Sequence, residues 1–122
     1  MPITETQLPL YEIKADLFKG LAHPQRIRIL EILSSAAEVP VAELLEETGL
    51  ESSHLSQHLA VLRRHRLVRS ERRASHVYYR LADPRTAELL AVARALLLSM
   101  LDTDSQRLAT AHELPDLPRV GA

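Results

Sequence analysis

The first third of the chain places apolar residues at helical spacing between charged ones. Four aliphatic side chains recur every three or four residues, which predicts an amphipathic helix. These positions are Leu10, Ile13, Leu17 and Leu21. Pro24 fits the first turn of a second helix, because its missing N–H would have no partner there. The apolar residues that follow predict that this second helix ends near Ser34.

The middle of the chain predicts two further helices separated by a tight turn. A short helix is expected over 40–47, and Gly49 can then adopt the positive φ that often follows a helix end. The next helix is expected over 53–65, with Ser52 or Ser53 capping its first turn. One face of this helix is apolar, so it packs along that face only. The apolar face consists of Leu55, Leu59 and Leu62.

Two β-prone segments and a long apolar helix complete the pattern. Residues 67–72 and 76–81 flank the polar turn 73–75 and predict a β-hairpin. Asp83 can cap a final helix that has Pro84 at its first position. This helix is expected to reach residue 101 and is apolar around much of its circumference. The excess of apolar surface predicts that the last helix packs against a partner.

The order of these elements predicts a mainly α fold with a small β-hairpin, which is a winged helix-turn-helix of five helices plus a wing. The chain has 122 residues, one Phe and no Trp, so its core must be aliphatic, which suits packed helices. We expect an N-terminal tail over 1–9, one DNA-binding and dimerisation domain over 10–101, and a mobile C-terminal tail over 102–122. No signal peptide or membrane-spanning run is evident, which predicts a cytoplasmic protein.

The net charge of −1 conceals a strongly basic segment. Residues 52–80 contain seven arginines and a single acid, Glu71, so their net charge is +6, whereas the remainder of the chain carries −7. The arginines are Arg63, Arg64, Arg66, Arg69, Arg72, Arg73 and Arg80. A basic block in an otherwise acidic chain is typical of a surface that contacts phosphates, and it predicts double-stranded DNA as the partner.

The polar face of the helix expected at 53–65 carries the candidate DNA contacts. In a helix-turn-helix the second helix enters the major groove with its N-terminal residues near the base edges. Gln57 is the strongest candidate, because its amide both donates and accepts hydrogen bonds, as the edge of adenine requires. The lesser candidates for base contacts are Ser53, His54 and Ser56. The expected phosphate or minor-groove contacts are Arg64, Arg72 and Arg73.

Several segments together resemble the ArsR-type winged-helix repressors. They are residues 23–30 (HPQRIRIL), 56–63 (SQHLAVLR), 67–68 (LV) and 77–81 (VYYRL). The resemblance covers roughly residues 10–100. It implies a homodimer joined through the first and last helices, bound to an imperfect palindrome at a promoter. It also implies an effector that weakens DNA binding.

The metal sites of this family are not recognisable in the chain. Pro40 and Ala42 occupy the positions of the family's cysteines, and the chain has no cysteine, which excludes thiolate metal sites. At the start of the last helix Asp83 matches a family ligand, but Arg85 replaces the paired histidine. The second pair of that site is replaced by Leu96 and Ser99. We therefore expect no metal and no cofactor, and the effector is unknown.

Three alternatives stay open at this point. His112 and Glu113 could belong to a non-standard histidine and carboxylate site of a metal- or ligand-responsive repressor, whereas His23 and His58 are expected to make structural contacts. A winged helix can also act as a protein-interaction adaptor, although an adaptor has no need for a charge of +6 on this segment. An enzyme is disfavoured, because the chain has three glycines, no phosphate-binding loop and no paired His-Glu motif.

Overall fold

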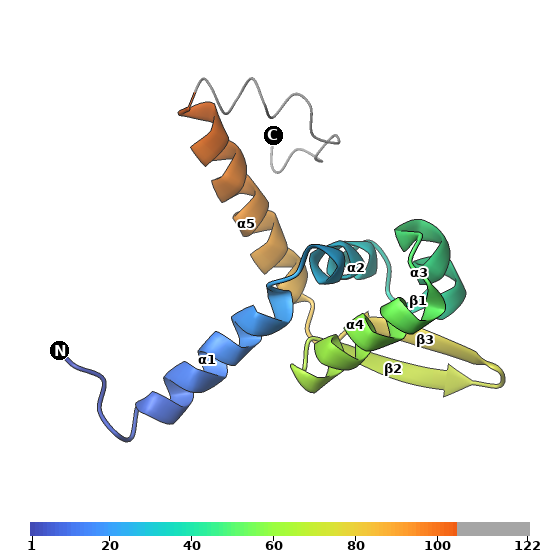
Figure 1. The fold of residues 1–122 in the computed structure, drawn as a ribbon, viewed down its shortest axis with the longest axis horizontal. Helices are drawn as coiled ribbons and strands as arrows, with labels where there is room; N and C mark the ends of the chain where they lie inside the picture. Colours follow the sequence, from blue (N-terminus) through green and yellow to red (C-terminus); the bar gives the residue numbers. More distant parts are fainter. Residues whose placement is uncertain (105–122) are drawn as a thin grey trace. The chain divides into compact units, whose positions relative to one another are not determined.

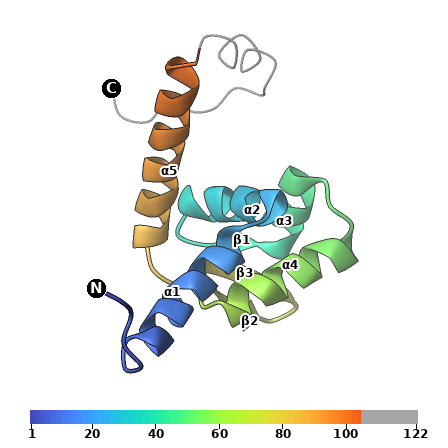
Figure 2. The ribbon, with the colours of Figure 1, turned by 60° about the vertical axis from the view of Figure 1, so that its left-hand side comes forward.

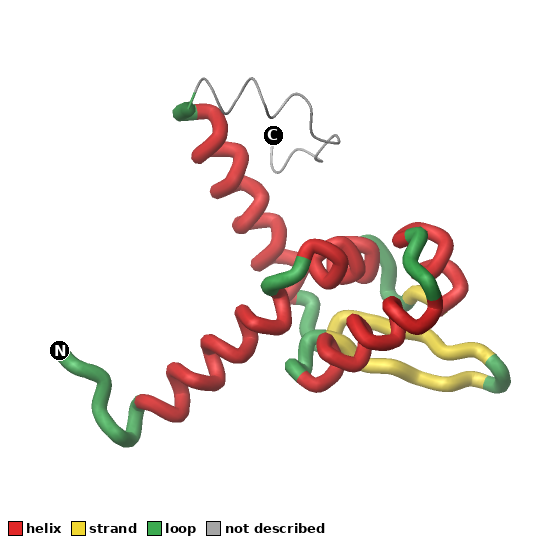
Figure 3. Tube along the Cα trace, viewed as in Figure 1, coloured by secondary structure: helices red, strands yellow, loops and turns green. Residues whose placement is uncertain are grey.

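The computed structural model describes residues 1–104, which form five helices and three short strands (Figure 1; Figure 3). The elements in chain order are α1 (Leu8–Leu21), α2 (Pro24–Ser34), β1 (Val39–Pro40), α3 (Val41–Thr48), α4 (Ser52–Arg64), β2 (Val68–Arg73), β3 (His76–Leu81) and α5 (Arg85–Asp102). The five helices and the hairpin of the predicted winged helix-turn-helix are confirmed. Of the expected C-terminal tail over 102–122, Asp102 belongs to α5 and residues 105–122 lie outside the described residues.

The chain divides into two compact units, one formed by Met1–Thr86 and one that begins at Ala87. In the first unit α2, α3 and α4 lie together beside the sheet (Figure 2). Its core is aliphatic, as the composition predicts, apart from Tyr79 of β3, and its largest fully buried side chains come from these three helices. They are Ile29, Leu30 and Leu33 of α2, Leu44 of α3, and Leu55 and Leu62 of α4. Full burial of one such side chain contributes about 1.5–3 kcal/mol, so this cluster holds α4 in place.

The junction between α1 and α2 is fixed by hydrogen bonds to groups that the helices leave unpaired. His23 caps α2, and its Nδ1 accepts a hydrogen bond from the backbone N–H of Gln25 at 3.1 Å. Arg26 closes the end of α1 by donating from Nε to the carbonyl oxygen of Gly20 at 2.8 Å and from Nη2 to that of Lys19 at 3.0 Å. Side-chain hydrogen bonds therefore stabilise both the end of α1 and the start of α2 at the predicted helix break before Pro24.

The three strands form an antiparallel sheet in the order β1-β3-β2. β2 and β3 are the predicted hairpin, in which Val68 lies opposite Leu81 and Arg73 lies opposite His76. β1 is an addition to the prediction, and its Val39 pairs with Tyr79 on the other edge of β3. A two-residue strand that ends in proline has no alternating pattern, so only its partner reveals it.

Two local predictions at the helix starts are wrong. α3 begins at Val41 instead of at Pro40, because Pro40 is the last residue of β1 and pairs with Tyr78. α4 is preceded by Glu51 in an extended conformation, with no side-chain hydrogen bond at this cap. The expected capping by Ser52 or Ser53 is therefore absent, since both residues lie within the first turn of α4.

Candidate DNA-binding surface

The turn between α3 and α4 is built from backbone hydrogen bonds and a left-handed glycine. Gly49 has a φ of 67°, and its N–H donates to the carbonyl oxygen of Leu45 at 3.0 Å. Thr48 Oγ1 donates to the carbonyl oxygen of Leu44 at 2.6 Å and accepts from the N–H of Leu50 at 3.3 Å. These bonds end α3 and redirect the chain into α4, which is the predicted helix-turn-helix arrangement.

α4 presents one buried and one exposed face. Leu55, Leu59 and Leu62 are only 1%, 3% and 0% exposed, respectively. The opposite face is exposed, as the helical spacing predicts. It consists of Ser53, Gln57, Ala60 and Arg64. The buried leucines therefore fix the rotation of α4 and point its polar face into solvent.

The candidate base-contacting side chains have no partner within the molecule. Ser53, His54, Ser56 and Gln57 are all exposed. Within residues 1–104 none of these four side chains forms a hydrogen bond or an ion pair. Their donors and acceptors are free for an external ligand such as a base edge.

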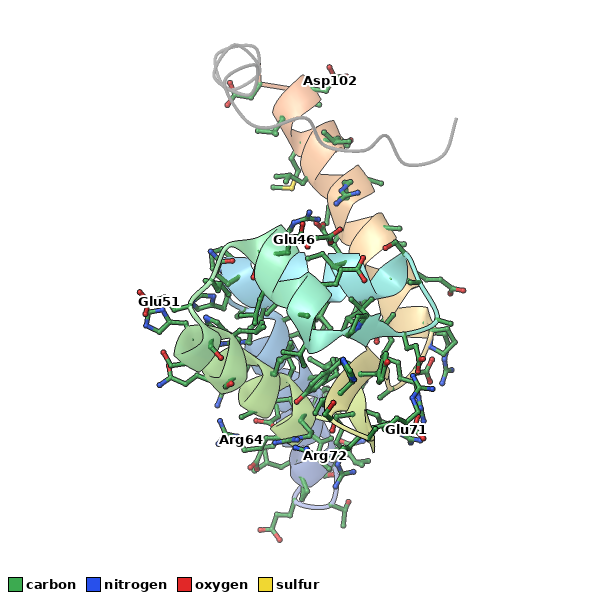
Figure 4. All side chains as sticks on the ribbon, turned by 90° about the vertical axis from the view of Figure 1, so that its right-hand side faces the viewer. Glu46, Glu51, Arg64, Glu71, Arg72 and Asp102 are labelled. Atoms are coloured by element: carbon green, nitrogen blue, oxygen red, sulfur yellow. The ribbon has the colours of Figure 1, made fainter. Side chains whose placement is uncertain are left out.

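The predicted phosphate contacts Arg64 and Arg72 lie on the same side of the first unit. In Figure 4 both labels lie below α3, whereas Glu46 is labelled on α3 above them. Arg64 and Arg72 are exposed, and no ion pair in the described part of the chain engages either one. The exposed face of α4 formed by Ser53, Gln57, Ala60 and Arg64 carries no acidic side chain, so it is open to a polyanion.

Arg73 differs from the other candidate arginines, because its guanidinium already has partners. Its Nη2 forms an ion pair and hydrogen bond with Oε1 of Glu38, and its guanidinium lies 3.9 Å from the centre of the Tyr78 ring. The hydrogen bond to Glu38 is also the main reason why the pKa of Arg73 is raised. These contacts tie the tip of the hairpin to the segment before β1, so Arg73 has a structural role that the local pattern does not reveal.

His23 and His58 make the structural contact between helices that the sequence predicts. Their ring centres are 4.4 Å apart, which joins the start of α2 to α4. Burial lowers the pKa of His58 from its usual 6.5, and nearby positive charge on His23, Arg26 and His54 lowers it further. The surroundings of His58 in the fold therefore favour its neutral form over its charged form.

A contact between distant segments fixes α1 against the end of α4, and sequence reasoning missed it. Asp16 Oδ2 lies 3.1 Å from Nδ1 of His65, whose side chain is only 14% exposed. A Cβ atom at Gly20 would lie 2.8 Å from Cδ1 of Leu67 and 2.9 Å from Cβ of His65, so only glycine fits there. Asp16 and His65 are 49 residues apart, and no local pattern links them.

At the family's metal-binding position the carboxylate of Asp83 is already paired with the guanidinium of Arg85. Oδ1 of Asp83 accepts from the N–H and from Nε of Arg85, at 2.9 and 3.1 Å, and Oδ2 accepts from Nη2 at 2.7 Å. These hydrogen bonds lower the pKa of Asp83 to about 2. Among residues 1–104 no three His, Asp or Glu side chains gather as metal ligands. His112 and Glu113, the proposed alternative ligands, lie outside the described residues.

None of the helices within residues 1–104 is long and apolar enough to cross a membrane.

Comparison with known proteins finds transcriptional regulators and repressors. Residues 21–71 match the family model described as a helix-turn-helix domain. The HTH-type transcriptional regulator Rv0081 of Mycobacterium tuberculosis is 50% identical over 107 residues, which are 87% of this chain and 90% of that protein. The biofilm growth-associated repressor of Agrobacterium fabrum is 35% identical over 100 residues, 79% of this chain and 85% of that protein.

Solved structures agree with these relatives. The crystal structure of Rv0081 superposes with a TM-score of 0.72 and 52% identity, covering 78% of this chain and 95% of that chain. The solution structure of Mb0332 from Mycobacterium bovis, described as a homodimeric winged helix-turn-helix DNA-binding domain, has a TM-score of 0.70 and 27% identity, covering 80% of this chain and 89% of that chain.

Proposed function

Because the chain belongs to the ArsR-type winged helix-turn-helix family of transcriptional regulators, we propose that it is a homodimeric repressor that binds a palindromic DNA operator. The observation that carries this proposal is the exposed face of α4, which has no partner within residues 1–104 and lies in a segment with a net charge of +6. On this proposal the protein has no catalytic activity. It acts in the compartment that contains the chromosome.

In the proposed complex α4 lies in the major groove. The amide of Gln57 pairs with the edge of adenine, because its Nε2 can donate to N7 while its Oε1 accepts from the N6 amino group. Ser53, His54 and Ser56 surround it and contact neighbouring bases or sugars. Arg64 and Arg72 contact phosphates, which set position and affinity but do not by themselves specify sequence. Arg73 contributes to the DNA contact through its charge while it holds the hairpin in place through Glu38.

Exposed apolar side chains on α1 and α5 support dimerisation through these helices. On α5 Val92, Leu96 and Met100 are 66%, 61% and 57% exposed, and on α1 Leu10 and Ile13 are 63% and 66% exposed. Large exposed apolar patches commonly mark interfaces between proteins. A two-fold dimer presents two copies of α4, and two half-sites related by the same symmetry form a palindrome.

The chain has no cysteine, so it offers no thiol to a thiol-reactive effector and no thiolate to a metal. Arg85 makes Asp83 an unsuitable metal ligand, since the carboxylate is already paired with a guanidinium. An adaptor role is the second candidate function. An adaptor role gives no reason for the exposed polar side chains of α4 and for its arginines, which form no ion pair in the described residues. The DNA-binding role is therefore favoured.

The proposal is tested by selecting bound duplexes from a pool of randomised DNA with the purified chain. We expect an inverted repeat whose half-sites are centred about 10–10.5 base pairs apart, or a multiple of that distance. Placed over a promoter, this sequence should lower reporter transcription when the chain is co-expressed. A pool without enrichment would contradict DNA reading, and a rise in transcription would contradict repression.

A further inference from the structure

Arg66 has a backbone conformation that is unusual for its residue type. Its φ of 62° lies in the left-handed region, which favours glycine. The conformation ends α4, because the N–H of Leu67 donates to the carbonyl oxygen of Leu62 at 2.9 Å. Glycine would make the same turn without strain, and strained residues of this kind are concentrated at functional sites. The strain therefore points to a function of the Arg66 side chain that glycine could not serve.

Arg66 lines a hollow at the junction between α4 and β2. The hollow measures about 440 Å³, and its other lining residues are Arg63, Val68, Arg69, Ser70 and Ala82. Nη1 of Arg63 donates to Oγ of Ser70 at 3.5 Å, so the side chain of Arg63 contacts β2 of the hairpin. The lining thus holds three guanidinium groups and no carboxylate.

The three arginines of this hollow form no ion pair within the described residues. Arg69 lies directly opposite Arg80 across the hairpin, and like charges in this position destabilise a strand pair. No ion pair within residues 1–104 engages Arg63, Arg66, Arg69 or Arg80. A second hollow, between α1 and the end of α4, is lined by Lys14 and Arg64 as well as Arg66, and its one carboxylate, Asp16, is paired with His65. A strained residue and a like-charge pair together indicate that an external anion completes this site.

We infer that Arg63, Arg66 and Arg69 bind a phosphodiester of the DNA backbone, with Arg66 at the centre of the site. This inference rests on the proposed function and adds a second anchor to it, at the C-terminal end of α4. The base-reading residues lie in the first half of the same helix, so the two sites would fix both ends of α4 on one duplex. An anchor on the backbone sets the register of the helix in the groove without reading sequence.

The test uses Arg66→Gly in the full-length chain, because glycine relieves the left-handed strain while it removes the charge. The midpoint of thermal unfolding should be equal to or higher than that of the wild type. The slope of log K against log salt concentration should become shallower by about 0.9 per lost contact, which is about 1.8 for a dimer. The loss should be equal on the selected operator and on random duplex. Arg66→Lys retains the charge and should keep the wild-type slope.

Arg28→Ala is the matched control, since it removes an exposed arginine of α2 and should leave the slope unchanged. A wild-type slope for Arg66→Gly, with DNA binding by the wild type intact, would overturn the inference and spare the proposed function. Absence of DNA binding by the wild type itself would overturn the proposed function. Inorganic phosphate is titrated separately. If it protects the wild type but not Arg66→Gly from unfolding while their DNA slopes agree, the site takes a free anion and the DNA inference is wrong.

Discussion

Replacing Gln57 by alanine isolates the base-reading contact, because the side chain has no structural role in the described residues. Gln57 is exposed on α4 and has no hydrogen-bond partner among residues 1–104. Alanine has a slightly higher helix propensity than glutamine, so the free energy of unfolding should change by less than about 0.5 kcal/mol. Any larger change in DNA affinity then reports the lost contact with DNA and not a change in fold.

The magnitude of this effect depends on the number of copies of α4 on the operator. One bidentate contact between an amide and adenine contributes about 1–3 kcal/mol of discrimination. A symmetric dimer loses two such contacts, so Gln57→Ala should cost about 2–6 kcal/mol, which is roughly a 30- to 20,000-fold rise in Kd. On a shuffled duplex, where binding depends on phosphates, the change should be less than about threefold.

Fluorescence anisotropy titrations of the wild type and Gln57→Ala measure both quantities at one fixed salt concentration. The shuffled duplex serves as the control, and thermal unfolding verifies that both proteins are equally folded. Equal losses on the operator and the shuffled duplex would refute base reading by Gln57. Wild-type affinity on both duplexes would show that Gln57 does not contact DNA.

The remaining predictions concern the wing, the dimer and pH. Arg72→Ala should weaken all duplexes alike and lower the salt slope by about 0.9 per contact, and an unchanged slope would remove Arg72 from the phosphate contacts. Leu97→Glu, at a side chain that is 44% exposed on α5, should give a monomer in sedimentation with weak operator binding. Leu97→Met should remain a dimer, and a dimeric Leu97→Glu would contradict the interface. Because folding lowers the pKa of His58, its contribution to stability is present above pH 6.5 and is lost as the pH falls toward the lowered value. The melting temperature of His58→Gln should therefore drop less between pH 7.5 and 5.5 than that of the wild type, and equal drops would exclude His58 as a source of the pH dependence.

The elements that could be predicted from the sequence are those specified by a local pattern. The leucine stripe of α4 sets its buried face, and Gly49 marks the turn before it. The polar face follows from these two features by helical geometry alone. For this reason the sequence predicts the exposed positions of α4 correctly, including Gln57 and Arg64.

The features that could not be predicted depend on contacts between distant segments. β1 is defined only by its pairing with β3, since Val39 and Pro40 are too few to show a pattern. Arg73 has the same local context as Arg72, yet Glu38, 35 residues earlier in the chain, engages it. The cap of α4 was mispredicted for a similar reason, because serine is a good capping residue but the backbone leaves the helix one residue earlier, at Glu51.

The central claim is that the exposed face of α4 lies in the major groove, and site-directed cleavage of DNA tests it directly. The chain has no cysteine, so Ala60→Cys provides a unique attachment point for iron-EDTA on that face. Glu46→Cys provides a matched point on α3, which lies away from Arg64 and Arg72 (Figure 4). We expect reagent at residue 60 to cleave the selected operator within both half-sites and reagent at residue 46 to cleave it weakly. Strong cleavage from residue 46 with none from residue 60 would contradict the claim.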